Sequence, residues 1–483
     1  MLIVFAFFES IHSGCGGSSN SRPSTVNENE RDTETQALVD ELISDGVLNS
    51  DETLPDSAVN YNTSSTTKSL SKSTATQSEN SNNTTTSDDQ SGNDNSNTNT
   101  NTNTELTFSP DSYTSGTVNG VTYRAYTNIT YVSSPVNESY QRMSIFIPET
   151  YISGGTLNGY TASTAPIFMP NSVGGYMAGQ ISSPSSNKSA GLALAKGYVV
   201  VSPALRGRNV TNGTAPACIV DYKAAVRYLK ANKSNLPAGD TDKIISSGTS
   251  AGGAISALLG ATGNSSDYDT WLDAIGAADA TDDIFASMCY CPITNLNNAD
   301  GAYEWTFGDD STASTALASL FMSYVNGLGL SYTLNSDGSG TFADYLESTG
   351  ITLSTYGAGR DKSQIPAFDK LDLSSAENNE FSDKHFTDYG YSNNTAAANG
   401  MADSAVIKAM NPMNYIGTAD TAQYWRIRHG TEDRDTSIAV PALLGLVLEK
   451  NGCTVDFEPA QGERHGGDYD LDELFEWIDS ICK

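Results

Sequence analysis

The sequence predicts an α/β fold, in which a mostly parallel sheet is flanked by helices. Three observations predict it. Short β-type runs alternate with helical segments, the alternation resumes near the end of the chain, and one apolar strand runs directly into a glycine-rich turn and an apolar helix. Strands that alternate with helices at this spacing are typical of parallel βαβ units. We expect this domain to span residues 105–483 of the 483-residue chain.

The first part of the domain starts with β-type runs and continues with alternating helices and strands. The expected elements are strands at 120–127, 143–148 and 166–170, a helix at 192–196, a strand at 198–203, a helix at 217–230, a strand at 243–247 and a helix at 254–261. Tyr198–Pro203 (YVVVSP) has the unbroken apolar run of a strand buried on both faces.

The last part of the domain resumes the same alternation after an irregular segment. The expected elements are a strand at 424–429, a helix at 439–450, a strand at 453–457 and a helix at 471–481. The segment at about 295–413 is polar, rich in Gly and Asp, and lacks clean alternation. Because loops at the carboxyl edge of such sheets carry binding sites, we expect this segment to be a cap or lid inserted there.

The first 104 residues are predicted to be a signal and a tether. Met1–Phe8 is an apolar run too short to span a bilayer, and the following Ser13-Gly14-Cys15 resembles a bacterial lipoprotein processing site. Residues 61–104 are almost entirely Ser, Thr, Asn, Asp and Gln, a composition that cannot form a packed core. We expect residues 1–14 to be a signal segment and 15–104 to be a disordered tether. The protein is then extracellular or at the cell surface, with a lipid anchor at Cys15. An ordinary cleaved signal is the alternative.

The net charge argues against two classes of partner. The chain has 57 Asp plus Glu against 26 Lys plus Arg, a formal net charge of −31. Such a surface repels phosphate backbones and anionic lipid head groups, so we expect no nucleic-acid partner and no membrane contact except through the lipid anchor.

Five cysteines remain outside the N-terminal segment: Cys218, Cys289, Cys291, Cys453 and Cys482. Their odd number means that at least one is unpaired or intermolecular, and the sequence leaves the pairing open. Cys289-Tyr-Cys291 has one intervening residue and no nearby histidine cluster, which argues against zinc. No metal and no cofactor are predicted.

The candidate nucleophile is Ser250, in the sequence Ser247-Gly-Thr-Ser-Ala-Gly-Gly253. This contains G-x-S-x-G, which is a weak pattern alone but here joins an apolar strand to an apolar helix. That strand–turn–helix context is what the nucleophile elbow of an α/β-hydrolase requires, and its glycines permit the tight turn. The helix that follows directs its positive end towards a developing oxyanion.

A serine nucleophile needs a base and an orienting carboxylate, and in this fold they follow in the order acid, then histidine. The chain has only four histidines. His12 lies in the signal, His385 in the insertion, and His429 at the end of a strand, in the turn that presents the acid. His465, between the last strand and the last helix, is therefore the expected base.

Three carboxylates compete for the role of the acid. The turn pattern H-G-x-x-D after the strand favours Asp433, while Asp435 and Glu432 remain alternatives. If both aspartates face the site, we expect one to orient His465 and the other to bind substrate. For the oxyanion we expect the backbone N–H of Ala251 and one from Gly174 or Gly175, in a glycine-containing loop after an early strand.

Several of these segments together resemble a known group of enzymes. Ser247–Gly253, Tyr424–Ser437, His465–Phe475 and Asn171–Tyr176 are similar to the corresponding parts of bacterial tannase-like and feruloyl-esterase-like α/β-hydrolases. The resemblance extends from about residue 105 to the end of the chain. It implies an α/β-hydrolase fold and a serine esterase whose small-molecule substrates are esters of phenolic acids, such as galloyl esters.

The resemblance also implies residues that recognise the phenolic ring. The carboxylate two residues after the acid contacts ring hydroxyls in tannases of this type, which corresponds to Asp435. A Lys and a Glu of the cap complete the recognition, for which Lys362 and Glu377 are the best-placed residues and Lys370 and Glu380 compete. No cysteine is adjacent to Ser250 or His465, unlike in the fungal group, where a disulfide joins the two.

Two other functions compete with the esterase. A serine peptidase of the same fold usually carries a propeller or peptide-binding domain, and the tether is too polar to be one. A non-catalytic surface-binding lipoprotein is favoured by loss of a catalytic residue, yet Ser250, Asp433 and His465 are all present. The expected reaction is therefore acyl transfer through an acyl-enzyme, without a cofactor.

Overall fold

The computed structural model describes residues 106–308, 311–354, 356, 380–382, 384–393 and 400–483. The predicted signal segment, the tether and Cys15 lie outside the described residues. None of the helices in the described part of the chain is long and apolar enough to cross a membrane.

Nine strands form one sheet within the described residues, in the order β1-β2-β3-β5-β4-β6-β7-β8-β9. The strands are β1 (Thr114–Val118), β2 (Val121–Thr130), β3 (Arg142–Pro148), β4 (Pro166–Pro170), β5 (Val199–Pro203), β6 (Asp240–Thr249), β7 (Ala286–Tyr290), β8 (Tyr424–Gly430) and β9 (Thr454–Ala460). The pairs among β1, β2, β3 and β5 are antiparallel, and those from β5 to β9 are parallel. The predicted α/β fold with a mostly parallel sheet is confirmed.

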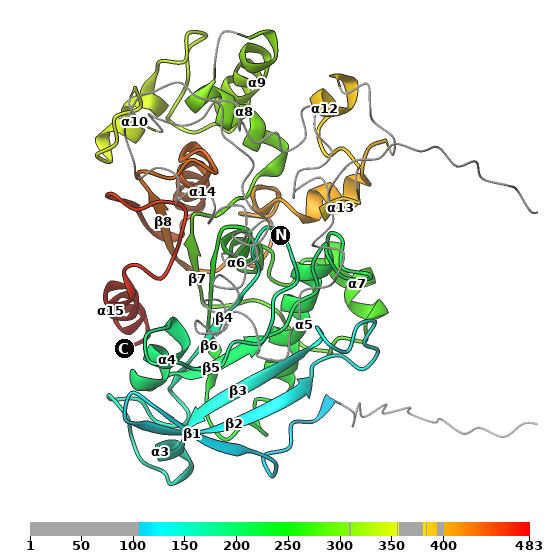
Figure 1. Cartoon of the computed structure of the whole chain (residues 1–483), viewed down its shortest axis with the longest axis vertical. Coiled ribbons are helices and arrows are strands. Elements are labelled where there is room, and N and C mark those ends of the chain that lie inside the picture. Colours follow the sequence, from blue (N-terminus) through cyan, green and yellow to red (C-terminus); the bar gives the residue numbers. More distant parts are fainter. Residues whose placement is uncertain (1–105, 309–310, 355, 357–379, 383, 394–399) are drawn as a thin grey trace, which may run out of the picture. The chain divides into compact units, whose positions relative to one another are not determined.

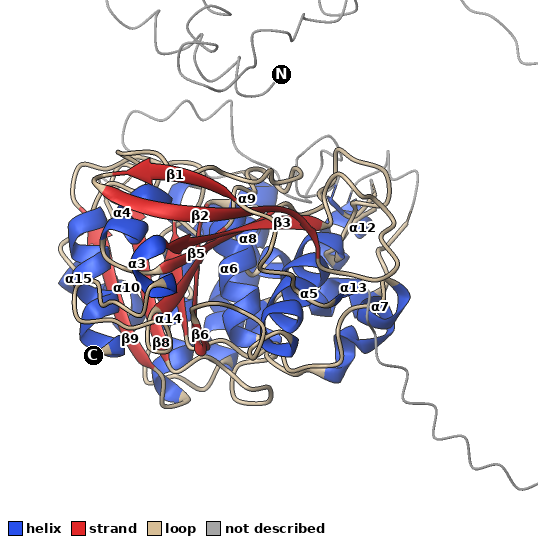
Figure 2. Cartoon of the chain, turned by 90° about the horizontal axis from the view of Figure 1, so that it is seen from below, coloured by secondary structure: helices blue, strands red, loops and turns tan. Residues whose placement is uncertain are grey.

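Helices cover both faces of this sheet. Those that connect its strands or end the chain are α3 (Glu149–Ile152), α4 (Ser189–Ala195), α5 (Ala217–Ala231), α6 (Ala251–Ala261), α7 (Asp269–Ala274), α14 (Ala439–Lys450) and α15 (Leu471–Cys482), with the short 3-10 helix η3 (Ser266–Tyr268). Figure 2 shows α4 and α15 on one side of the strands and α5 and α6 on the other. Every residue of α6 is buried, which explains why this helix is apolar on all sides.

The sheet contains two strands that the sequence pattern did not predict, β1 and β7. Strand β7 (ASMCY) is fully buried between β6 and β8. It combines apolar residues with Ser287 and Cys289, so it lacks the unbroken apolar run of β5. The hydroxyl of Ser287 donates to the carbonyl of Ser256 on α6 at 2.9 Å, which satisfies the polar group inside the core.

The described residues between β7 and β8 form helices and no strand. These helices are α8 (Leu296–Phe307), α9 (Thr312–Gly327), α10 (Thr341–Ser348), α12 (Asp388–Asn393), α13 (Ser404–Ala409) and the 3-10 helix η5 (Pro412–Asn414). Figure 1 shows α8, α9 and α10 gathered beyond α14. They share an apolar cluster with α14 that includes Phe321, Phe342, Leu346 and Leu443. This cluster attaches α9 and α10 to the helix that follows β8.

Candidate active site

Ser250 lies at the sharp turn between β6 and α6. Its backbone adopts φ 61° and ψ −126°, a conformation that costs an L-residue free energy and that persists only where the surrounding structure enforces it. The backbone N–H of Ser250 donates to the carbonyl of Tyr290 at 2.9 Å, which ties the turn to the end of β7. The motif and its context predicted this tight turn between strand and helix, and the structure adds its strained backbone conformation.

The two glycines of G-x-S-x-G are required by close backbone contacts. A Cβ on Gly248 would lie 2.3 Å from the carbonyl oxygen of Gly252. A Cβ on Gly252 would lie 2.6 Å from the carbonyl oxygen of Val173. Any side chain at either position would therefore force the strand, the helix and the neighbouring loop apart.

His465 lies between Ser250 and Asp433. Its Nε2 is 2.8 Å from the Oγ of Ser250, and its Nδ1 is 2.8 Å from the Oδ2 of Asp433. Since a carboxylate only accepts hydrogen bonds, Nδ1–H donates to Asp433, and Nε2 is then free to accept the Ser250 proton. The Asp433 side chain is fully buried, whereas that of His465 is 19% exposed. The structure thus brings together the three residues that the sequence placed in this order.

The loop that carries His465 is anchored by Asp470. The carboxylate of Asp470 accepts a hydrogen bond of 2.5 Å from the hydroxyl of Tyr290, which lies at the end of β7. Its other oxygen is 2.6 Å from the guanidinium of Arg426 on β8, and Arg426 is buried. A buried, charge-assisted contact of this kind fixes the loop against the sheet edge and so fixes the imidazole.

The electrostatics of the site follow from the burial of Asp433. Burial raises the pKa of Asp433, but the charge of His429 and the hydrogen bond from His465 outweigh burial, so its net pKa is lowered. Burial lowers the pKa of His465, but the hydrogen bond to Asp433 outweighs it, so its net pKa is raised. The carboxylate therefore stays ionised and favours the imidazolium.

The competing carboxylates occupy different positions. Asp435 donates its backbone N–H to the Oδ1 of Asp433 at 2.9 Å, while its own side chain is 64% exposed, with Oδ2 3.8 Å from the Nδ1 of His465. Glu432 is half exposed and faces Arg464 at 3.7 Å. Only Asp433 makes the short hydrogen bond to His465, which leaves Asp435 at the edge of the site.

The loop expected to supply the second oxyanion donor lies directly against the elbow. The side-chain amide of Asn171 donates to the carbonyls of Ser247 and Gly252, both at 3.0 Å. Further along this loop, Gly175 has φ 52°. Ala251 is the first residue of α6, where backbone N–H groups have no partner within the helix. The structure therefore places the loop of Gly174 and Gly175 beside the start of α6, and the oxyanion role stays a prediction.

The predicted ring-recognition residues of the cap, Lys362 and Glu377, and the competing Lys370 lie outside the described residues. The other competitor, Glu380, is described and fully buried. Its Oε1 is 3.6 Å from the thiol of Cys218, in the first turn of α5.

Within the described part of the chain, two groups of side chains bring metal-ligating residue types close together, and both contain Asp433. One is Cys291, His429 and Asp433, and the other is Asp433, Asp435 and His465; in each, the ligand atoms lie within 4.8 Å of one another. A metal ion bound in either group would take the carboxylate that His465 uses. All five cysteines of the described residues are free thiols.

His429, Tyr356 and Cys291 lie close to Asp433, and sequence reasoning missed their association. Tyr356 and His429 are 73 residues apart, yet the tyrosine hydroxyl is 2.9 Å from the Nε2 of His429. Cys291 directly follows β7 with φ 42°. The only sequence signal was the position of His429 at the end of the strand that presents the acid.

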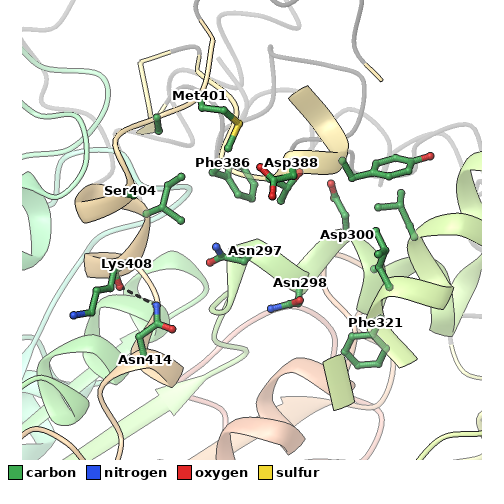
Figure 3. Close-up of a pocket in the computed structure, with 17 residues that line it drawn as sticks. Asn297, Asn298, Asp300, Phe321, Phe386, Asp388, Met401, Ser404, Lys408 and Asn414 are labelled. Atoms are coloured by element: carbon green, nitrogen blue, oxygen red, sulfur yellow. Dashed lines mark hydrogen bonds between the residues drawn. The ribbon is translucent and has the colours of Figure 1, made fainter. Parts of the chain in front are cut away.

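A cavity of about 710 Å³ lies between the cap helices α8, α9, α12 and α13 (Figure 3). Its wall combines apolar side chains with amides and carboxylates, among them Phe321, Phe386, Met401, Asn297, Asn298 and Asp388. None of Ser250, His465 and Asp433 lines it. The cavity is therefore separate from the Ser250–His465–Asp433 site.

Comparisons with known proteins agree with this architecture. The family described as BD-FAE, which is feruloyl-esterase-like, matches residues 161–322. Among curated protein sequences, none matches the chain.

Solved structures of tannases are similar over most of the chain. The tannase of Fusobacterium nucleatum is 42% identical, with a TM-score of 0.72, and the match covers 78% of this chain and 99% of that one. A tannase of Lactobacillus plantarum is 38% identical, with a TM-score of 0.72, over 78% of this chain and 100% of that one. A tannin acyl hydrolase in complex with ethyl gallate is 39% identical, with a TM-score of 0.72, over 79% and 100% of the two chains. This chain thus belongs to the tannase family and is a carboxylic ester hydrolase.

Proposed function

We propose that this protein is a serine esterase that hydrolyses esters of phenolic acids, galloyl esters among them, through Ser250, His465 and Asp433. The observation that carries the proposal is the continuous chain of hydrogen bonds from the Ser250 hydroxyl through His465 to the buried carboxylate of Asp433. This arrangement is what a weakly acidic hydroxyl needs in order to become a nucleophile at neutral pH.

The geometry supports a two-step acyl transfer. The Oγ of Ser250 attacks the ester carbonyl carbon while the Nε2 of His465 takes the hydroxyl proton. The tetrahedral intermediate collapses, the C–O bond to the alcohol breaks, and His465 returns the proton to the leaving oxygen. Water then attacks the acyl-serine with His465 as base, which releases the carboxylic acid and restores the Ser250 hydroxyl. In each step His465 takes one proton and returns it, so the imidazole is neutral again at the end of the cycle.

Asp435 supports the phenolic part of the proposal. Its exposed carboxylate lies beside the imidazole, at the mouth of the site. Adjacent phenolic hydroxyls are good donors, and an ionised carboxylate is the matching acceptor. Among the family's solved structures, tannin acyl hydrolases have been seen with ethyl gallate and with 3,4-dihydroxybenzoate.

We expect Asp435→Asn to lower kcat/KM selectively for substrates that carry ring hydroxyls. A hydrogen bond to a charged group contributes about 1.5–3 kcal/mol, so kcat/KM for methyl gallate should fall by roughly 10- to 100-fold. For methyl benzoate, which has no ring hydroxyl, it should change by less than about twofold. The measurement is the hydrolysis of both esters by the full chain and by the variant.

Glu432→Gln is the matched control, because Glu432 is a neighbouring exposed carboxylate that points towards Arg464. It should leave the gallate-to-benzoate ratio unchanged. An equal loss on both esters with Asp435→Asn would contradict the role of Asp435 in ring recognition. Hydrolysis of p-nitrophenyl acetate but of neither methyl gallate nor methyl ferulate would contradict the phenolic substrate class.

The pH profile should show that the neutral imidazole is the active form. Because the net pKa of His465 is raised, the inactive imidazolium persists to higher pH than an ordinary histidine would allow. We expect kcat/KM to fall on the acidic side with a midpoint above the usual histidine value of about 6.5. The measurement is kcat/KM for p-nitrophenyl acetate across the pH range in which the fold is stable. A midpoint at or below the usual value would contradict the strong coupling of His465 to Asp433.

A further inference from the structure

A second histidine is buried directly behind the site. His429 is fully buried at the end of β8, and its Nε2 is 2.9 Å from the hydroxyl of Tyr356. Tyr356 is buried as well and stacks on Phe307, the last residue of α8, with the ring centroids 5.3 Å apart and the planes 15° from parallel. A buried ring with two polar nitrogens is costly to place in a core, so the arrangement requires a compensating contact.

The hydroxyl of Tyr356 makes that contact, and the same nitrogen also lies near the carboxylate of Asp433. The Nε2 of His429 lies 3.6 Å from the Oδ2 of Asp433, the same oxygen that accepts the hydrogen bond from His465. The other oxygen, Oδ1, accepts the backbone N–H of Asp435 at 2.9 Å. The carboxylate thus accepts hydrogen bonds from His465 and from the turn after β8, and it lies within ion-pair distance of His429.

Among the described residues, the titratable groups that face His429 are Asp433, Cys291, Tyr356 and His465. Burial lowers the pKa of His429, but the negative charge of Asp433 and the contact with Cys291 outweigh it, and the net pKa is raised. Burial raises the pKa of Tyr356, so its hydroxyl stays neutral. A positive charge on His429 stabilises the ionised form of Asp433. It also competes with His465 for the same carboxylate.

We propose that His429, held by the hydroxyl of Tyr356, is a positioning residue that fixes the carboxylate of Asp433 against His465. The inference rests on the proposed function, because it acts through the proposed acid. Tyr356 belongs to the segment between β7 and β8. Its contact with His429 therefore links the position of this cap segment on the sheet to the orientation of the Asp433 carboxylate. His429 touches no reacting atom in this scheme.

The test compares the full chain with Tyr356→Phe, His429→Leu and His429→Gln. Loss of one hydrogen bond of about 1 kcal/mol predicts that Tyr356→Phe lowers kcat for p-nitrophenyl acetate by roughly fivefold with KM unchanged. His429→Leu, which also removes the ion-pair contact with Asp433, should lower kcat further, and His429→Gln should recover part of the loss. Because a protonated His429 opposes protonation of the neighbouring His465, both His429 variants should move the acidic limb of the pH profile to higher pH.

Tyr268→Phe is the matched control. It removes a buried hydroxyl that donates to the carbonyl of Ala409 at 2.6 Å, and it does not touch the site. It should leave kcat within about twofold of the unmodified chain. Retention of kcat within the same range by Tyr356→Phe, with an unshifted acidic limb in folded His429→Gln, would overturn the inference.

The rate at which a fluorophosphonate labels Ser250 separates this inference from the proposed function. Labelling of the unmodified chain at Ser250, with slower labelling of Tyr356→Phe, supports both. Equal labelling of the chain and the Tyr356→Phe variant overturns the positioning role alone. No labelling of Ser250 in the unmodified chain overturns the proposed function itself.

Discussion

Ser250→Ala is expected to abolish ester hydrolysis, with a loss in kcat on the order of 10⁶-fold, because removal of the nucleophile leaves only substrate binding and oxyanion stabilisation. The substitution deletes one oxygen, and alanine tolerates the φ of 61° no worse than serine does. The fold should therefore persist, with an unchanged midpoint of thermal unfolding. The measurement is hydrolysis of methyl gallate and p-nitrophenyl acetate at high enzyme concentration.

Ser256→Ala is the control for this prediction. Ser256 lies on α6, fully buried, and donates to the hydroxyl of Ser246 at 2.7 Å, away from His465. Its loss should change stability by about 1 kcal/mol and leave kcat nearly unchanged. If Ser250→Ala kept more than about 1% of the activity, a result that the proposed mechanism does not allow, Ser250 would not be the nucleophile.

Asp433→Asn should produce the second largest effect, a loss in kcat on the order of 10⁴-fold. An amide in place of the carboxylate donates to Nδ1 and so stabilises the wrong tautomer of His465, with the proton on Nε2. The imidazole can then no longer accept the Ser250 proton. The amide also carries no charge, so the acidic limb of any residual activity should move to lower pH.

Comparing Asp435→Asn with Asp433→Asn identifies which of the two carboxylates orients His465. The two aspartates are two residues apart, and both have an oxygen within 4 Å of the Nδ1 of His465. On p-nitrophenyl acetate, which has no phenolic acyl group, Asp433→Asn should be severe and Asp435→Asn mild. The reverse order would mean that Asp435 orients the histidine and that the short hydrogen bond to Asp433 is not the catalytic one.

Much of the site was predictable because its chemistry is encoded locally. The strand Lys243–Ser247, the glycine pair around Ser250 and the apolar helix lie within 20 residues, and the close contacts of Gly248 and Gly252 explain why no other residue fits there. His465 could be predicted because the chain has few histidines and the order of the three residues is set by the fold. Both inferences need no knowledge of distant contacts.

The remainder depends on contacts between distant segments. Strand β7 escaped prediction because its buried serine is satisfied by a carbonyl on α6, which the local pattern does not reveal. The contact of Tyr356 with His429 joins a cap residue to the end of a core strand. The sequence of the polar segment before β8 shows no alternation of strands and helices. Its helices α9 and α10 are stabilised largely by apolar packing in a cluster that also contains α14. Such tertiary contacts override weak local preferences.

The most direct test of Ser250 as the nucleophile is to label the full chain with a fluorophosphonate and locate the modified residue by peptide mass spectrometry. The Ser250–His465–Asp433 mechanism predicts stoichiometric phosphonylation of Ser250, with a parallel loss of methyl gallate hydrolysis and a rate of labelling that falls sharply in Asp433→Asn. Complete inactivation with the phosphonate on another residue, or gallate hydrolysis that survives full labelling of Ser250, would contradict it.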